Sequence, residues 1–185
     1  MEIPSGSALI VIDSQNDFVN NLPEEMEGGK VLEEVIKTIT YFRSKNLPIV
    51  HFREIHRHQH VDFGRELDGD EGVHCIEGTY DADYCKGVEP LESEYKIDKR
   101  RYSGFFATDL DLLLRGLKVQ YLYIVGFLTD VCVHYTSVDA HQHDYHIKVF
   151  KEAVGGSSLA AHNASLNAIE YLQHGAVIST NELED

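Results

Sequence analysis

The chain has 185 residues, and its 43% hydrophobic and 25% charged residues are ordinary values for one globular domain spanning 1–185. Its formal net charge of −15 argues against nucleic-acid binding, which requires clustered lysine and arginine side chains. No stretch is long and apolar enough to cross a membrane, and residues 1–9 are too polar for a signal peptide.

The first half of the chain predicts alternating strands and helices. A continuous apolar run at 8–12 is typical of a buried parallel strand, and it ends at Asp13. A helical pattern follows over 31–42, and a second apolar strand is predicted at 49–52. Residues 54–92 are polar and carry no sustained period, which favours a long functional or lid-like loop.

The second half of the chain continues this alternation. Thr108 is placed to cap its first helix, and Ser157 or Ser158 its last. Strands that alternate with helices of this length predict an α/β fold: a three-layer, Rossmann-like arrangement with a mostly parallel, doubly wound sheet and helices on both faces. The predicted elements are a strand at 95–97, a helix at 110–117, a strand at 119–125, a helix from 132 to about 144, a strand at 147–150, a helix ending at 173 and a strand at 176–178.

The most informative stretch is 126–133, which reads Gly-Phe-Leu-Thr-Asp-Val-Cys-Val. After the preceding strand, Thr129 or Asp130 can cap a helix that begins near Cys132. A thiol on the first turn of a helix sees unpaired N–H groups and the positive end of the helix dipole, which lower its pKa and favour the thiolate. The same N–H groups could hold an oxyanion. Taken alone, a small buried thiol is an equally good interpretation.

The three cysteines of the chain are odd in number and form no CxxC pair, which predicts reduced thiols in a cytoplasmic protein. A redox thiol enzyme would need Cys75 or Cys85 to fold close to Cys132.

Three charged or nucleophilic residues are expected to meet at one edge of the sheet. Ligands bind such sheets at the carboxyl ends of the strands, where Asp13 follows the first strand and Cys132 a later one. Asp98 and Lys99 follow the short strand near residue 96 and are expected to point the same way. A carboxylate that takes the thiol proton and a lysine that holds both charges form a set for acyl transfer. The alternatives are a turn role for Asp13 and a surface position for Lys99.

Three ordered motifs carry a family resemblance. They are Asp13-Ser-Gln-Asn-Asp17-Phe18, then Lys99-Arg-Arg-Tyr-Ser103-Gly-Phe105 with Thr108-Asp-Leu110, then Gly126-Phe-Leu-Thr129-Asp130-Val-Cys132-Val133. In this order and spacing, residues 7–180 resemble the isochorismatase-like cysteine hydrolases, the superfamily that includes the nicotinamidases.

The resemblance implies specific roles within this site. Asp13, Lys99 and Cys132 would form the catalytic triad, and the peptide bond before Leu128 would be cis. The oxyanion hole would consist of the backbone N–H groups of Leu128 and Cys132. Phe18 and Tyr102 fall where the family has walls of the substrate pocket, and the alternative for each is a core aromatic.

The cysteine at position 132 resembles the amidase branch of this superfamily, because other members carry glycine there. The implied reaction is hydrolysis of the C–N bond of a small amide through a thioester acyl-enzyme. Nicotinamide is the leading substrate, and a ureido or carbamoyl compound is the alternative. The resemblance also implies a homo-oligomer, either a dimer or a tetramer. An alternative of another class is a non-catalytic metal- or ligand-binding domain on the same scaffold.

The chain contains eleven histidines, and a histidine-rich loop is often only a solvated segment. Nicotinamidases, however, bind a divalent metal through an Asp-x-His pair and a later histidine before a cysteine. At the matching positions the resemblance implies Glu54, His56 and His74 as ligands, with His58 and His60 as alternatives. This set suits zinc, iron or manganese, and no organic cofactor is expected. Four later histidines are expected at the surface or an interface: His134, His141, His143 and His146.

The chain departs from the nicotinamidase pattern beside this loop. Glu54 replaces the usual aspartate, and Ile55 and Arg57 replace the tryptophan and proline expected around His56. Leu128 replaces a small residue beside the implied oxyanion hole. These changes do not affect the triad, but they argue against assuming that nicotinamide itself is the substrate.

Overall fold

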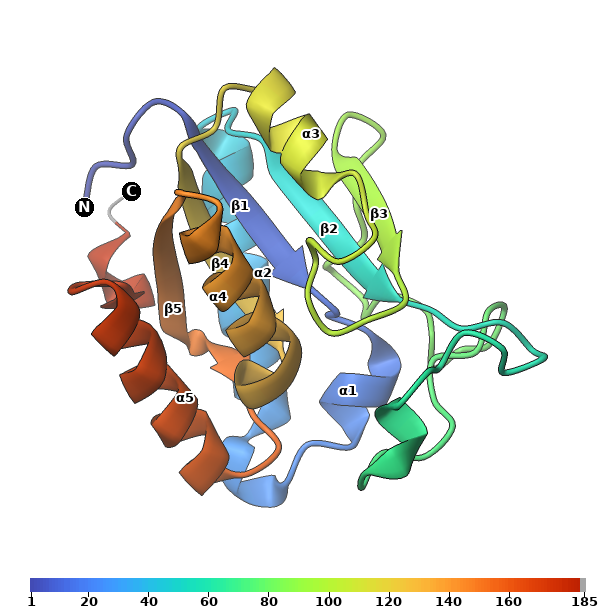
Figure 1. The fold of residues 1–185 in the computed structure, drawn as a ribbon. Helices are drawn as coiled ribbons and strands as arrows, with labels where there is room; N and C mark the ends of the chain where they lie inside the picture. The colour runs from blue at the N-terminus through green and yellow to red at the C-terminus, as the bar shows by residue number, and fades with distance from the viewer. Residues whose placement is uncertain (184–185) are drawn as a thin grey trace.

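The computed structural model describes residues 1–183, and a six-stranded sheet forms its centre (Figure 1). The strands lie in the order β3-β2-β1-β4-β5-β6, and every neighbouring pair is parallel. The strand order reverses between β1 and β4, as in doubly wound folds, which confirms the predicted α/β architecture. The strands are β1 (Ser7–Ile12), β2 (Ile49–Glu54), β3 (Tyr95–Lys99), β4 (Tyr121–Phe127), β5 (His146–Gly155) and β6 (Val177–Ile178).

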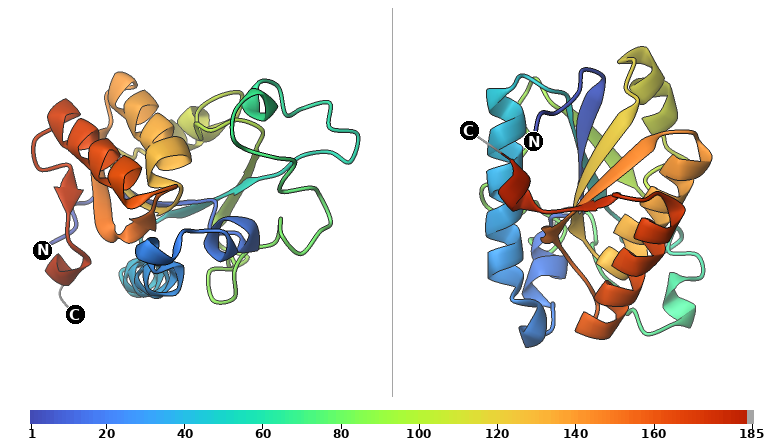
Figure 2. Two further views of the ribbon diagram at one scale, coloured as in Figure 1. Left: turned by 90° about the horizontal axis from the view of Figure 1, so that it is seen from below. Right: turned by 90° about the vertical axis from the view of Figure 1, so that its left-hand side faces the viewer.

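Helices cover both faces of this sheet (Figure 2). Side chains alternate along β1, so Leu9 and Val11 pack against the α2 side while Ile10 and Ile12 face the opposite side. Each face therefore has its own hydrophobic core. The α1 and α2 helices lie on one face, and the other three lie on the opposite face. The helices are α1 (Asn16–Asn20), α2 (Gly28–Ser44), α3 (Leu110–Gly116), α4 (His134–Gln142) and α5 (Leu159–Leu172).

The predicted helix caps are only partly correct. Ser158 caps α5, because its Oγ accepts the N–H of Ala161 at 3.1 Å. Thr108 is not the N-cap of α3, which is Asp109, although the Thr108 hydroxyl accepts the Leu110 N–H at 3.3 Å.

The turn that carries Cys132 also differs from the prediction. It begins as a π-helical turn, Thr129–Val133, and continues directly into α4. Neither Thr129 nor Asp130 caps it, because both side chains bind elsewhere. The Thr129 hydroxyl lies 2.9 Å from Nδ1 of His162, and Asp130 accepts the N–H of Ser157 at 2.8 Å. These bonds fasten the turn to the start of α5.

The segment between β2 and β3 is the long irregular loop that the sequence predicted. Within the described chain its only helical part is a 3-10 turn at Glu66–Asp68. The loop projects beyond the carboxyl ends of β2 and β3 (Figure 1). Among residues 1–183, no helix is long and apolar enough to cross a membrane.

Candidate active site

The carboxyl ends of four neighbouring strands place four buried polar side chains together. Asp13 directly follows β1, while Glu54 and Lys99 are the last residues of β2 and β3 and are register partners. Cys132 lies in the turn after β4. The structure thus brings together the three residues predicted as a triad and adds Glu54 to them.

A close approach between β1 and β4 positions this turn. The φ angle of Gly126 is +118°, and a Cβ atom there would lie 1.9 Å from the carbonyl oxygen of Ile12, so only glycine fits. The next peptide bond, Phe127–Leu128, is cis, as the resemblance implied. The Leu128 carbonyl then accepts the N–H of Val133 at 3.0 Å. The turn that follows carries Cys132.

Lys99 lies at the centre of the charged group. Its Nζ is 2.7 Å from Oδ2 of Asp13, 2.5 Å from Oε2 of Glu54 and 3.4 Å from Sγ of Cys132. Oε2 of Glu54 also lies 3.4 Å from the Cys132 sulfur. No more than 2% of any of these four residues is exposed. A lysine ammonium in contact with two carboxylates and a thiol is thus shielded from water.

Burial governs the proton affinities in this group. It raises the pKa of Asp13 to about 6, although Lys99 opposes the shift. Burial also raises the pKa of the Cys132 thiol, and Lys99 only partly offsets this. Burial disfavours the charge of Lys99, but Asp13, Cys132 and Glu54 together raise its pKa well above the ordinary value. The predicted lowering of the thiol pKa by the helix end is therefore wrong for the resting protein, because burial raises this pKa.

Asp98 does not belong to this group, contrary to the prediction. Because side chains alternate along β3, Lys99 faces the buried side while Asp98 is exposed. Its Oδ1 accepts a hydrogen bond from Nε of Arg53 at 3.0 Å.

A second cluster adjoins the first through Glu54. The donor atoms of Glu54, His56, Glu66 and His74 all lie within 4.8 Å of one another. Oε1 of Glu54 is 3.0 Å from Nε2 of His74, and Oε2 of Glu66 is 3.4 Å from Nε2 of His56. The three ligands implied by the resemblance thus lie together. Glu66 is a fourth member of the cluster that the sequence analysis did not predict.

Glu66 bears on whether this cluster fits a metal ion. Its side chain is 3% exposed, and neither carboxylate oxygen has a hydrogen-bond partner among the described residues. A buried carboxylate without a donor is costly unless a cation compensates it. Two carboxylates and two imidazoles form a donor set that suits zinc, iron or manganese. The alternative ligands His58 and His60 are exposed and lie outside the cluster.

Two further residues that the sequence reasoning missed support the clusters. The ring of Phe63 stacks on His56, with 3.9 Å between centroids and 15° between planes. The side-chain amide of Gln15 donates to the Glu54 carbonyl and accepts the Glu54 N–H, both at 2.8 Å. Gln15 therefore holds the end of β2. It belongs to the first motif, whereas Phe63 lies in a loop with no sequence period.

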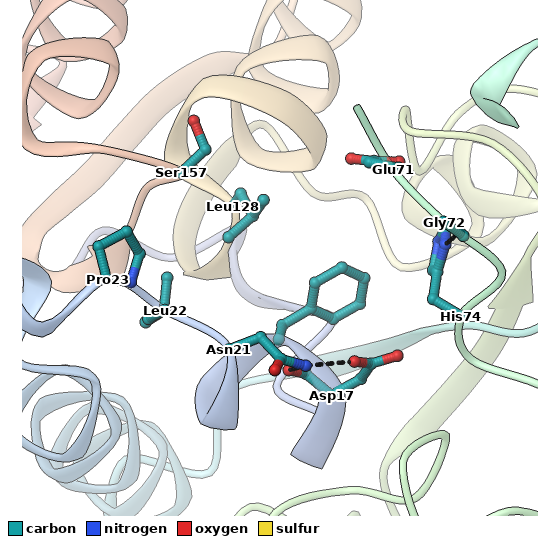
Figure 3. A pocket seen from close by; sticks show the side chains of 10 residues that line it. Asp17, Asn21, Leu22, Pro23, Glu71, Gly72, His74, Leu128 and Ser157 are labelled. Carbon is teal, nitrogen blue, oxygen red and sulfur yellow. Dashed lines mark hydrogen bonds between the residues drawn. The ribbon is translucent and has the colours of Figure 1, made fainter. Parts of the chain in front are cut away.

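A pocket of about 290 Å³ opens beside the two clusters (Figure 3). Leu128, which directly precedes the Cys132 turn, lines this pocket. His74, which contacts Glu54, lines it as well. Phe18 lines the pocket, at the place where the resemblance put a wall. Tyr102 lines a neighbouring hollow instead, and its hydroxyl donates to Glu71 of the pocket at 3.1 Å. The full lining is Asp17, Phe18, Asn21, Leu22, Pro23, Glu71, Gly72, His74, Leu128 and Ser157.

The four later histidines lie on or after the helix that continues the Cys132 turn. His141, His143 and His146 are exposed, and His134 is partly buried. The His143 ring stacks on Phe105, and none of the four belongs to a metal-ligand cluster among the described residues.

Comparison with known proteins identifies the family to which the chain belongs. Residues 7–182 match the model of the isochorismatase domain. An Arabidopsis thaliana protein named "Probable inactive nicotinamidase" is 32% identical over 168 residues, covering 86% of each chain. The ureidoacrylate amidohydrolase of Acinetobacter baylyi is 27% identical over 165 residues, covering 77% of this chain and 67% of that protein. The crystal structure of the pyrazinamidase of Pyrococcus horikoshii in complex with zinc has a TM-score of 0.82 and 32% identity, covering 94% of this chain and 99% of that one. The chain therefore belongs to the isochorismatase family.

Proposed function

We propose that the protein is a cysteine amidohydrolase that cleaves the C–N bond of a small amide, with nicotinamide as the first substrate to test. The observation that carries this proposal is the buried contact of Lys99 with both Asp13 and Cys132. A pocket of about 290 Å³ beside them is at the lower end of the range for ligand sites, which favours a small substrate.

Acylation begins with a proton transfer. Asp13, with a pKa raised by burial to about 6, is ionised at neutral pH and can take the thiol proton of Cys132. The sulfur then forms a bond to the amide carbonyl carbon. The N–H groups of Leu128 and Cys132 donate to the resulting oxyanion. Lys99 stays protonated throughout, and its charge offsets that of the thiolate.

Release of the nitrogen and hydrolysis complete the cycle. Asp13 returns the proton to the amide nitrogen, the C–N bond breaks and ammonia leaves, which gives a thioester on Cys132. Asp13 next takes a proton from water, which attacks the thioester carbon. The C–S bond breaks, and the acid product and the free thiol form as Asp13 passes its proton to the sulfur.

The second cluster fits a divalent metal that Glu54, His56, Glu66 and His74 would hold. When bound, such a metal supplies Lewis-acid character that can orient a donor group of the substrate. The zinc complex of the pyrazinamidase relative supports this assignment. Glu54 has a double role in this arrangement, because one carboxylate oxygen faces His74 while the other faces Lys99.

Two alternatives have their own support. The ureidoacrylate amidohydrolase relative favours a ureido substrate for the same chemistry. The relative with the name "Probable inactive nicotinamidase" favours a non-catalytic metal- or ligand-binding domain. Against the latter stands the presence of Asp13, Lys99 and Cys132 together in one buried group, since a binding domain has no need of a complete triad.

Ammonia release tests the proposal directly. We would compare the wild type, Cys132→Ala and Cys85→Ala on nicotinamide, pyrazinamide and ureidoacrylate, with zinc or manganese present. Cys85 is a matched control, because it is buried in the core on the α2 side of the sheet. We expect release by the wild type and by Cys85→Ala but none by Cys132→Ala. Undiminished release by Cys132→Ala would contradict the proposal, and metal binding without any release would favour the binding domain.

A further inference from the structure

The pocket beside Cys132 carries acidic groups on one side and apolar groups on the other. Leu22, Pro23 and Leu128 form the apolar part, while Glu71 lies across the pocket from Pro23 and Leu22 (Figure 3). Asp17 contributes a second carboxylate to the lining. Among the described residues that line this pocket, none is a lysine or an arginine. A negatively charged substrate would therefore meet no lysine or arginine there, and the imidazole of His74, which also lines the pocket, is already paired with Glu54 at 3.0 Å.

Both pocket carboxylates accept hydrogen bonds from neutral groups. The Asp17 carboxylate accepts hydrogen bonds from the Asn21 amide at 2.7 Å and the Cys75 N–H at 3.2 Å. Glu71 accepts from the Tyr102 hydroxyl at 3.1 Å. Within residues 1–183, neither carboxylate forms a salt bridge with lysine or arginine. Their negative charges thus remain available to a bound molecule.

The neighbouring clusters add no net positive charge to balance them. The two negative charges of Glu54 and Glu66 would cancel the double positive charge of one divalent metal ion. The ammonium of Lys99 is matched by Asp13, which lies 2.7 Å away. Asp17 and Glu71 are then left as the uncompensated charges around the pocket.

We propose that this pocket selects amides by charge: it favours an acyl group that carries a positive charge, accepts a neutral one and excludes one that carries a carboxylate. A carboxylate held in this pocket would lose water and face Glu71, with no lysine or arginine among the lining residues to pair with it. This inference rests on the proposed amidohydrolase function and names its substrate class. It favours uncharged or cationic amides over the carboxylate-bearing ureido compounds considered above.

Amides of matched shape and different charge provide the test. 3-Aminopropanamide and butanamide are isosteres with positive and zero charge, and succinamate carries a negative charge on a terminal group that is two heavy atoms larger. 3-(Aminomethyl)benzamide, 3-ethylbenzamide and 3-carbamoylbenzoate form an aromatic series whose charged and neutral groups differ by at most one heavy atom. We expect kcat/KM to fall from the cation to the anion by about tenfold or more, as interaction of one charge with a partly buried carboxylate requires.

Substitutions of Glu71 test whether this side chain causes the charge selectivity. Glu71→Gln should reduce the cation-to-anion ratio of kcat/KM by about tenfold, because it removes the charge while keeping the shape. Glu71→Asp should keep most of the ratio. Glu92→Gln is the matched control, since Glu92 is an exposed acid on the same loop and does not line the pocket.

Each outcome separates this inference from the proposed function. Hydrolysis of the anion at the rate of the cation, or an unchanged ratio in Glu71→Gln, overturns the charge selection while ammonia release upholds the amidohydrolase. If no amide is hydrolysed, the amidohydrolase proposal fails, and calorimetric binding of the same amides to Cys132→Ala decides the inference. Preferred binding of the cation supports charge selection, and equal or tighter binding of the anion overturns it.

Discussion

Two carboxylate networks in this molecule differ in how completely their hydrogen bonds are satisfied. Just before the amino end of β3, the Glu94 carboxylate accepts hydrogen bonds from Nε and Nη2 of Arg43 at 2.7 and 2.9 Å. It also accepts one from the N–H of Leu91 at 2.9 Å. The Nε2 atom of His51 also lies 2.9 Å from it. This carboxylate is 7% exposed and has a partner for each oxygen.

The network at the carboxyl ends of the strands is the opposite case. Glu66 accepts no hydrogen bond from the described residues, and the oxygens of Asp13 rely on the ion pair with Lys99. Lys99 is also shared with Glu54. Complete satisfaction around Glu94 is what a structural network requires, whereas incomplete satisfaction is typical of a site that leaves room for a ligand or for chemistry.

The largest expected effect comes from Lys99→Gln. This change leaves the buried carboxylates of Asp13 and Glu54 without their shared cation, so we expect ammonia release to disappear. The free energy of unfolding should fall by about 3–5 kcal/mol, as in other broken buried ion pairs. Urea denaturation with far-UV circular dichroism checks that the variant is folded when its activity is measured. Activity close to that of the wild type would show that the group is only structural.

Glu66→Gln should act on metal binding rather than on folding. We expect the affinity for zinc to fall on the order of 10- to 100-fold, measured by competition with a fluorescent chelator. The unfolding free energy in EDTA should change by less than about 1 kcal/mol, because the carboxylate accepts no hydrogen bond that is lost. Glu77→Gln, on the same loop but outside the cluster, is the control. Unchanged zinc affinity would remove Glu66 from the proposed ligand set.

The same chemical change at Glu94 should have the opposite pattern. Glu94→Gln should lower the unfolding free energy at neutral pH by about 1.5–3 kcal/mol and leave kcat unchanged. Burial opposes ionisation of Glu94, but Arg43 and the Leu91 N–H prevail and lower its pKa from 4.5 to about 2. A lowered pKa stabilises the fold above the ordinary value, so the difference between wild type and variant should shrink as the pH falls from 4.5 toward 2. A constant difference over that range would contradict this account.

The smallest expected effect is the pH dependence of turnover. Because burial raises the pKa of Asp13 to about 6, the carboxylate loses its role as base when it is protonated below that pH. We expect kcat/KM to fall roughly tenfold per pH unit once the pH is well below 6. A rate profile from about pH 3.5 to 8 on an uncharged amide, over the range in which the protein stays folded, measures this. An acidic limb at the ordinary aspartate value of 3.8 would contradict the raised pKa of Asp13.

Much of the site could be predicted because its residues directly follow apolar strands. Asp13 and Cys132 were placed by the strand pattern, and the motifs identified Lys99 beside them. Glu66 and Phe63 could not be found, because the loop that carries them has no period and tertiary contacts alone bring them to His56. The strand pattern was less reliable for Asp98. The sequence predicted that β3 ends at residue 97, but the strand continues for two more residues, and the alternation within it turns Asp98 outward.

The proton affinity of Cys132 was predicted wrongly for a related reason. The sequence indicates a helix end, but not that the thiol is 2% exposed beside two carboxylates. The expected homo-oligomer, single-domain organisation and cytoplasmic location stay predictions. The fold itself was predictable, since alternating strands and helices of these lengths allow few other arrangements.

The most direct test of the central claim is the mass of the intact protein, quenched in acid during turnover of an amide, with peptide mapping of the modified residue. The account predicts a mass increase equal to the acyl group, located on Cys132, present in the wild type and in Cys85→Ala and absent in Cys132→Ala. Steady ammonia release by the wild type with an acyl group on another residue, or undiminished release by Cys132→Ala, would contradict it.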